Sequence, residues 1–182
     1  MREKTTAKLN TAGTLLWILV TLNAVSCDRR VRPSNDSAVD RAGGRLVSAE
    51  VIKKMTKIDG HRVYVPVYSH IYHMQDDVYN LTNTLSIRNT DAAGDIYISS
   101  AKYYDTKGKL VRDYITKPVQ LPALATLEYI IGVNDTTGGS GANFIVEWMS
   151  DKVVTEPVIE CVMVGTQSQQ GVSFISVGKV LD

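Results

Sequence analysis

The sequence is poor in the side chains from which catalytic and metal sites are usually built. It contains three histidines and two cysteines, and every histidine precedes Cys161, whereas a blue-copper site usually takes a histidine shortly after its cysteine. No nucleophile, base and orienting group stand together in a catalytic pattern. The sequence by itself therefore predicts no reaction and no cofactor.

The strand-rich part of the chain also lacks a basic cluster. Residues 28–60 hold eight Lys and Arg against five Asp and Glu, a net charge of +3, while residues 61–182 hold nine against thirteen, a net charge of −4. A domain that binds nucleic acid through its phosphates is expected to carry clustered basic residues. We therefore expect no nucleic-acid partner.

The apolar segment near the start of the chain is too short to be a permanent transmembrane helix. Thr14–Leu22 has nine residues and would span about 13 Å as a helix, against the roughly 30 Å of a hydrocarbon core. Basic residues precede it at Arg2, Lys4 and Lys8, and small residues follow it. This order is typical of an export signal, so residues 1–26 are predicted to be a cleaved signal peptide.

Cys27 is the predicted site of lipidation. The preceding residues Leu22-Asn23-Ala24-Val25-Ser26 resemble a bacterial lipobox, after which lipoprotein signal peptidase leaves an acylated cysteine at the new amino terminus. Several acyl chains together would give stable membrane anchoring, and Asp28 resembles the signal that some bacteria use for inner-membrane retention. The predicted location is the bacterial cell envelope, facing the periplasm or the exterior. The alternative is ordinary cleavage after Ala24-Val25-Ser26, which would give a secreted or periplasmic soluble protein.

Residues 27–60 are predicted to form a tether that ends in a short amphipathic helix. Residues 28–47 are polar and contain the breakers Pro33, Gly43 and Gly44, which is typical of a flexible linker. Ser48 is then placed to cap a helix that Gly60 would end. We expect the apolar stripe of this helix to rest on the folded domain rather than on the bilayer. The stripe consists of Val51, Ile52, Met55 and Ile58, opposite Lys53, Lys54 and Lys57.

From His61 onward the pattern predicts strands separated by turns. The most informative strand is Asn143–Trp148, in which Phe144, Val146 and Trp148 alternate with polar residues, as expected when one face is buried. Cys161 lies in an apolar run and is interpreted as a small buried hydrophobe. We predict an all-β, immunoglobulin-like, antiparallel two-sheet sandwich of about seven to eight strands over residues 61–182. The expected strands are 63–68, 79–88, 96–104, 110–115, 127–133, 143–148, 158–165 and 172–181.

Three separated segments resemble a known family. They are Tyr64-Val65-Pro66-Val67-Tyr68-Ser69-His70-Ile71-Tyr72, Leu85-Ser86-Ile87-Arg88-Asn89-Thr90-Asp91 and Gly141-Ala142-Asn143-Phe144-Ile145-Val146-Glu147-Trp148. Together they are similar to the bacterial family catalogued as domain of unknown function 3124, over about His61 to Leu181. The resemblance implies an exported bacterial protein and brings no activity with it.

The best candidate for a metal cluster is His70 and His73 with Asp76 and Asp77, because imidazole and carboxylate groups together suit zinc or copper. Positions three apart on a strand point to opposite faces, so both histidines could bind one ion only from a loop. Surface or loop-ordering histidines are the alternative interpretation.

Two other motifs have a structural interpretation beside the functional one. Asn89, Asp91, Gly94 and Asp95 suggest a calcium loop, but the spacing does not place a glutamate at the twelfth EF-hand position, and a plain Asx turn explains them as well. The run Gly138–Ala142 lacks the lysine of a phosphate loop and the last glycine of a nucleophile elbow. We expect it to be a loop that needs positive φ angles.

The predicted function is a non-enzymatic binding or assembly module for another envelope protein or a glycan, held at the membrane by acylated Cys27. The alternative is a metal-binding protein or metal-dependent enzyme that uses His70, His73, Asp76 and Asp77.

Overall fold

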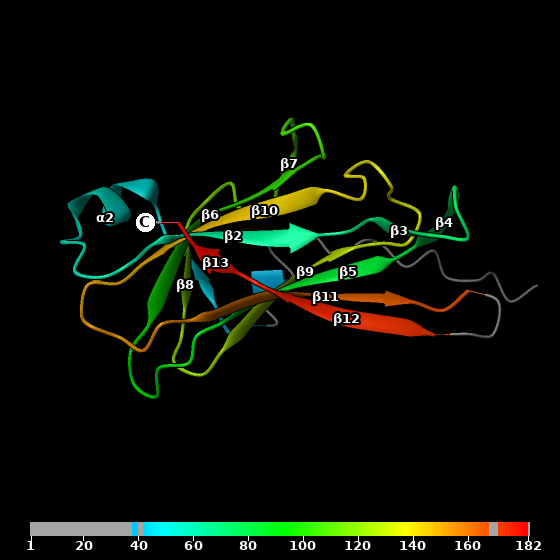
Figure 1. Ribbon diagram of the computed structural model, residues 1–182. Helices are drawn as coiled ribbons and strands as arrows, with labels where there is room; N and C mark the ends of the chain where they lie inside the picture. Colours follow the sequence, from blue (N-terminus) through cyan, green and yellow to red (C-terminus); the bar gives the residue numbers. More distant parts are fainter. Residues whose placement is uncertain (1–37, 40–41, 168–170, 182) are drawn as a thin grey trace, which may run out of the picture. The chain divides into compact units, whose positions relative to one another are not determined.

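The computed structural model describes residues 38–39, 42–167 and 171–181 (Figure 1). The predicted signal peptide and Cys27 lie outside the described residues. The described part is an all-β antiparallel sandwich, as predicted, with its strands in two main sheets.

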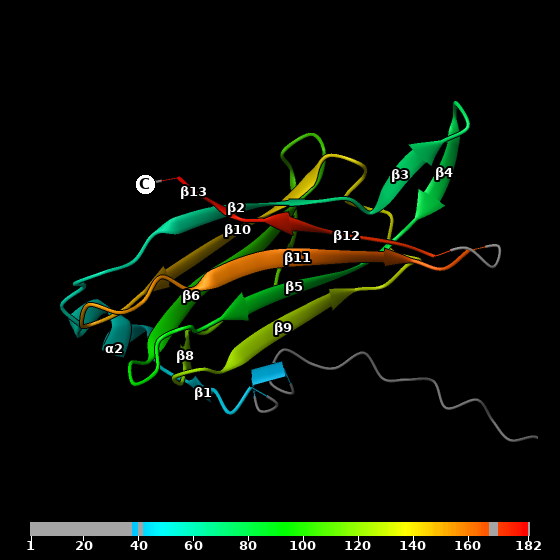
Figure 2. The same ribbon diagram turned by 60° about the horizontal axis from the view of Figure 1, so that its bottom comes forward.

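The first sheet has the strand order β1-β8-β6-β10-β2-β13, and β7 also pairs with β6. The second sheet has the order β12-β11-β5-β9, and Figure 2 shows these four strands side by side. A separate two-stranded hairpin consists of β3 and β4. In the first sheet the bounds are β1 Arg45–Leu46, β2 Arg62–Val67, β6 Ile96–Tyr104, β7 Leu110–Asp113, β8 Val119–Leu121, β10 Ala142–Met149 and β13 Lys179–Val180. In the others they are β5 Thr82–Arg88, β9 Thr126–Ile131, β11 Val158–Gly165, β12 Val172–Val177, β3 His70–His73 and β4 Asp77–Asn80.

Strand β10 lies at the centre of the first sheet, between β2 and β6. The side chains of Phe144 and Val146 are fully buried and Trp148 is 2% exposed, which confirms the predicted inner face of this strand. The second sheet contributes its own inner residues to the same core, and Cys161 is fully buried among them. Burial raises the pKa of the Cys161 thiol to about 12, as expected for a cysteine that acts as a small hydrophobe.

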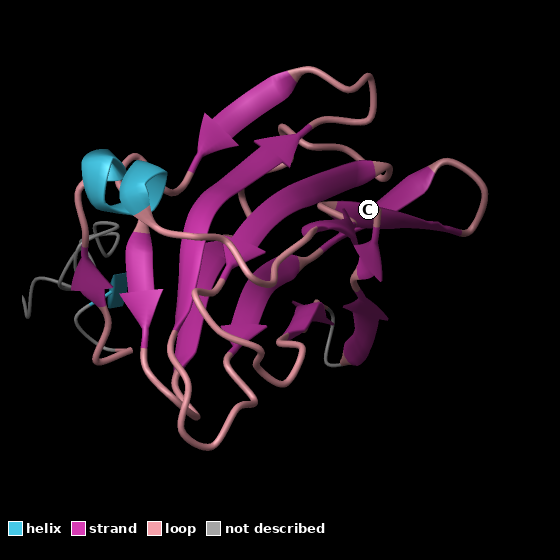
Figure 3. Ribbon diagram, turned by 90° about the vertical axis from the view of Figure 1, so that its left-hand side faces the viewer, coloured by secondary structure: helices cyan, strands magenta, loops and turns pink. Residues whose placement is uncertain are grey.

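The short helix α2 spans Ala49–Lys54 and lies outside the strands (Figure 3). The hydroxyl of Ser48 accepts a hydrogen bond from the backbone N–H of Val51 at 3.3 Å, so the predicted cap is confirmed. The helix ends at Lys54, with Met55 as its C-cap, earlier than the predicted Gly60. Gly60 serves another purpose: its φ is +133° and a Cβ there would collide with the backbone of Trp148 and Met149.

Part of the predicted tether is built into the fold. Val39 is buried in the core, and β1 pairs with β8 through Arg45 and Leu46. The backbone N–H of Val47 donates to the carbonyl of Pro118 at 2.9 Å. The predicted apolar stripe of α2 is buried only in part, since Ile52 and Met55 are half-buried while Val51 and Ile58 are exposed.

Candidate functional site

The four predicted metal ligands lie on or beside the β3–β4 hairpin. His73 and Asp77 are cross-strand partners, while His70 pairs with Asn80 at the other end of the hairpin. The loop arrangement that a shared ion would require is not found: both histidines lie on β3, three positions apart, so they point to opposite faces. Within residues 38–39, 42–167 and 171–181, no group of three or more His, Cys, Asp or Glu side chains could hold a metal ion.

Each histidine of the hairpin has a local contact that explains its position. The Nδ1 atom of His70 lies 3.1 Å from the Ser69 hydroxyl, and its ring meets the edge of Tyr72 at 5.4 Å between centroids. The ring of His73 lies 5.9 Å from that of Tyr79. These contacts support the interpretation of both residues as surface histidines.

The segment from Asn89 to Asp95 forms an Asx turn. Asp91 Oδ1 accepts hydrogen bonds from the backbone N–H groups of Ala93 and Gly94, at 2.9 and 2.6 Å, and Oδ2 accepts one from Thr155 at 2.9 Å. The hydrogen bond from Thr155, with those from Ala93 and Gly94, lowers the pKa of Asp91 to about 2. The carboxylate is therefore engaged in holding two loops together.

In the glycine-rich loop, one glycine has the positive φ angle that was expected, and at another position there is no room for a larger side chain. Gly139 has a φ of +80°, in the region that favours glycine. A Cβ at Gly138 would collide with the hydroxyl of Tyr103, which is buried beneath the loop. The run therefore closes one end of the core.

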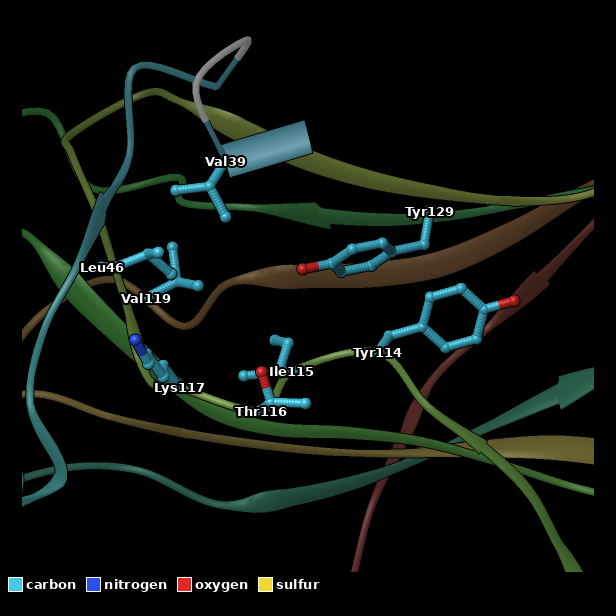
Figure 4. Close-up of a pocket in the computed structure, with 8 residues that line it drawn as sticks. All are labelled: Val39, Leu46, Tyr114, Ile115, Thr116, Lys117, Val119 and Tyr129. Atoms are coloured by element: carbon cyan, nitrogen blue, oxygen red, sulfur yellow. The ribbon is translucent and has the colours of Figure 1, made fainter. Parts of the chain in front are cut away.

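A small pocket opens between the β7–β8 connection, β9 and the segment that contains β1. Figure 4 shows its lining residues, and its volume is about 190 Å³. Tyr114, Ile115, Val119, Val39 and Tyr129 are all buried, so the walls are fixed by the core. The full lining is Val39, Leu46, Tyr114, Ile115, Thr116, Lys117, Val119 and Tyr129.

A partly buried ion pair fixes the inner wall of this pocket. Arg112 Nη2 lies 3.0 Å from Asp135 Oδ2, and Arg112 Nη1 donates to the Tyr114 hydroxyl at 2.8 Å. Burial alone would raise the pKa of Asp135, but hydrogen bonds from Thr137 and Arg112 hold it below its usual value. Figure 4 shows the Tyr114 hydroxyl pointing away from the pocket, so the ring of this residue, not its hydroxyl, faces the space.

The outer face of the second sheet carries a group of exposed aliphatic side chains among polar ones, which the strand prediction did not bring out. We call it the apolar sheet face. Register places Ile175, Val162, Thr84 and Ile130 in one row across β12, β11, β5 and β9. Ile175 is 58% exposed and Val177 is 70% exposed. A signal for this face stands in the sequence of β11, where Val158, Val162 and Val164 occupy the positions between its buried residues. The apolar sheet face consists of Ile130, Val158, Val162, Val164, Ile175 and Val177.

Comparisons with known proteins identify a family but no activity. A family model described as "Protein of unknown function (DUF3124)" matches residues 60–181. No curated protein matches the chain. The crystal structure of Thermotoga maritima 1070 is similar, with a TM-score of 0.43 and 12% sequence identity over 65% of this chain and 92% of that chain. Among the residues that the structure describes, no helix has the length and apolar character needed to cross a membrane.

Proposed function

The chain belongs to the DUF3124 family, and from this premise we propose that it is a non-enzymatic binding module of the bacterial cell envelope. It is held at the membrane by an acylated Cys27 and docks another envelope protein through the apolar sheet face. The family description names no activity, so the proposal depends on the residues of this chain.

The observation that carries the proposal is the exposure of β-branched side chains on the second sheet. An antiparallel sheet with one face in the core normally presents polar residues on its other face. Here Ile130, Ile175 and Val177 are each more than half exposed. Contiguous apolar patches of about 300–600 Å² on a monomer often mark interaction sites, and water would be released from this one when a partner covers it.

The chemistry of the apolar sheet face favours a protein partner over a glycan. Its exposed side chains are aliphatic, whereas a sugar offers hydroxyl groups that need polar partners. Charged residues lie among these aliphatic side chains: Glu160 pairs with Val177 and Arg88 pairs with Val158, and Arg88 Nε is 3.4 Å from Glu160 Oε1. The row of Ile175, Val162, Thr84 and Ile130 holds no charged residue. An uncharged centre bordered by polar residues is the usual anatomy of a protein interface.

The export signal and Cys27 supply the location. Acylation of Cys27 would leave residues 28–37 between the membrane and Ala38, which is buried in the core. Ten residues have an end-to-end distance of roughly 17 Å if the chain is flexible. The domain would then stay close to the bilayer, and its partner would be a membrane-bound or periplasmic protein within that reach.

Photocrosslinking in living bacteria tests the docking surface. A photoreactive residue at Ile175, in the apolar sheet face, is expected to give an adduct of defined mass with an envelope protein. The matched control is the same residue at Val153, which is 81% exposed but lies outside that face. Equal adducts from both positions, or none from position 175, would contradict the proposal.

The anchor has a separate test, so that its outcome does not decide the docking surface. Cys27→Ser is expected to move the protein from the membrane fraction to the soluble fraction, and mass spectrometry of the unsubstituted protein should find an acylated Cys27 at the mature amino terminus. A mature chain that begins at another residue would favour the secreted alternative.

A further inference from the structure

We propose that the pocket of Figure 4 is a binding site for a small carboxylate with a single-ring apolar body. This inference does not depend on the docking surface. On β9, Tyr129 faces the core and lines the pocket, whereas its neighbour Ile130 belongs to the apolar sheet face. The two sites therefore lie on opposite sides of the same strand.

The volume sets the size of the ligand. At about 190 Å³ the pocket is smaller than the roughly 300–1,000 Å³ typical of sites for larger ligands. It is slightly larger than an engineered cavity of about 150 Å³ that holds benzene. One ring with a short substituent would fill it, and a long acyl chain or a sugar chain would not fit inside.

The side chains that form the walls determine which chemical group of a ligand can enter the pocket. Val39, Ile115 and Val119 contribute aliphatic groups, and each is at most 5% exposed. The rings of Tyr114 and Tyr129 lie 5.1 Å apart between centroids at 51°, and aromatic rings pack favourably against one another in offset or edge-to-face arrangements. The pocket is thus suited to an apolar, planar body.

The side chains at the rim of the pocket determine the preferred charge of the ligand group that stays near solvent. Lys117 is the one charged side chain among the eight described residues of the lining, and its neighbour in the chain, Thr116, also lines the pocket. Figure 4 shows the Lys117 ammonium at the edge of the pocket and the Tyr129 hydroxyl directed toward the enclosed space. An ammonium at the edge of the pocket favours a carboxylate over a neutral or cationic group.

The pocket is held in its shape by the fold. Arg112 donates to the Tyr114 hydroxyl at 2.8 Å and pairs with Asp135 at 3.0 Å, so the Tyr114 ring is fixed from behind. Leu46 on the opposite wall belongs to β1, which pairs with β8 beside Val119. A ligand would therefore lose little free energy to ordering of the protein.

The test measures binding of 4-fluorobenzoate by ¹⁹F NMR to the full chain held in lipid nanodiscs, with empty nanodiscs as the blank. The neutral probe 4-fluorobenzyl alcohol is measured in parallel. We expect saturable binding of the carboxylate that exceeds binding of the alcohol. Lys117→Met should weaken binding of the carboxylate about two- to five-fold, which lies within the range of an exposed ion pair, and leave binding of the alcohol unchanged.

Two further variants locate the site. Thr116→Trp changes an exposed rim residue, so the chain should still fold, and its indole should block entry of both probes. Lys57→Met is the matched control, because Lys57 is an exposed lysine that does not line this pocket. Binding that is no stronger for the carboxylate than for the alcohol, or that survives Thr116→Trp, or that Lys57→Met weakens as much as Lys117→Met, would overturn the proposal.

Discussion

The outer faces of the two sheets differ in composition although both sheets cover the same core. On the first sheet, one row across β2, β10 and β6 holds Tyr64, Ile145 and Lys102. The next row holds Arg62, Glu147 and Ser100. On the second sheet, one row holds Ile175, Val162, Thr84 and Ile130, and the next row holds Val177, Glu160, Ser86 and Glu128. In these two rows the first face has one aliphatic residue, Ile145, whereas the second face has four.

The difference between the two outer faces is not explained by the packing of the core. Each strand requires apolar residues on its inner face, and both sheets supply them. Nothing in the packing of the core requires Ile175 or Val177 on the outer face, since both are more than half exposed. Their side chains contribute little to stability in the isolated domain, and the partner that we propose would give their exposure a physical reason.

The largest expected effect is on the core that both faces share. Trp148→Ala should lower the free energy of unfolding by about 3–5 kcal/mol, because the indole is 2% exposed. Urea unfolding measures it. Glu147→Ala, on the outer face of the same strand, is the control and should change the free energy by less than about 0.5 kcal/mol. Similar losses in both variants would mean that the inner and outer faces of β10 are not distinguished as described.

The next effect concerns a link between the loop that follows β5 and the end of β8. Asn89 lies between β5 and β6, and its Nδ2 donates to the carbonyls of Gly94, Leu121 and Pro122 at 2.7, 3.1 and 2.9 Å. Asn89→Ala should cost roughly 2–4 kcal/mol, because buried carbonyls lose their donors. Unfolding in urea measures this loss.

The control for Asn89 is Thr90→Val, which removes one exposed hydrogen bond, from the Thr90 hydroxyl to the carbonyl of Glu156 at 2.8 Å. It should cost about 1 kcal/mol or less. An Asn89→Ala variant as stable as Thr90→Val would show that the asparagine is not the main link.

A smaller, pH-dependent effect is expected at Asp91, which joins the loop after β5 to the loop before β11. Its pKa is lowered from 3.8 to about 2, chiefly by the hydrogen bond from the backbone of Thr155. A group with a lowered pKa in the folded state stabilises above its unfolded pKa, and this contribution is lost as the pH falls through the folded value. The free energy of unfolding, measured during an acid titration, should therefore decline between about pH 4 and pH 2. In Asp91→Asn that part of the decline should be smaller, and an unchanged profile would contradict the assignment.

The main strands could be predicted because their alternation reports burial directly. Phe144, Val146 and Trp148 alternate with Asn143 and Glu147, and the structure buries the first three. The alternation of buried and exposed residues no longer predicts burial where a strand contains a bulge. In β6 the register shifts opposite Glu147, so that Ile98 and Ala101 both face the core although they are three positions apart. No residue type marks that bulge.

Other features depended on contacts between distant residues and could not be derived from local pattern. The predicted strand 172–181 is divided at Gly178, where the chain passes from the second sheet to the first. The hairpin β3–β4 was hidden because its turn contains Met74 and Gln75 at φ of 45° and 71°, and non-glycine residues seldom adopt such angles. The pocket was unpredictable for the same reason, since Val39, Ile115 and Tyr129 meet only in the folded chain.

The smallest expected effect on stability is the sharpest test of the difference between the outer faces. Ile175 is 58% exposed, so Ile175→Lys should change the free energy of unfolding by less than about 0.5 kcal/mol. The same variant should abolish the crosslinked adduct from a photoreactive residue at Val164, because a lysine in the apolar sheet face would have to be desolvated under a partner. Ile145→Lys, on the outer face of the first sheet, should leave that adduct unchanged. A loss of stability above about 1 kcal/mol in Ile175→Lys would mean that the fold itself holds this side chain, and the apolar character of the second face would then be explained by stability rather than by a partner.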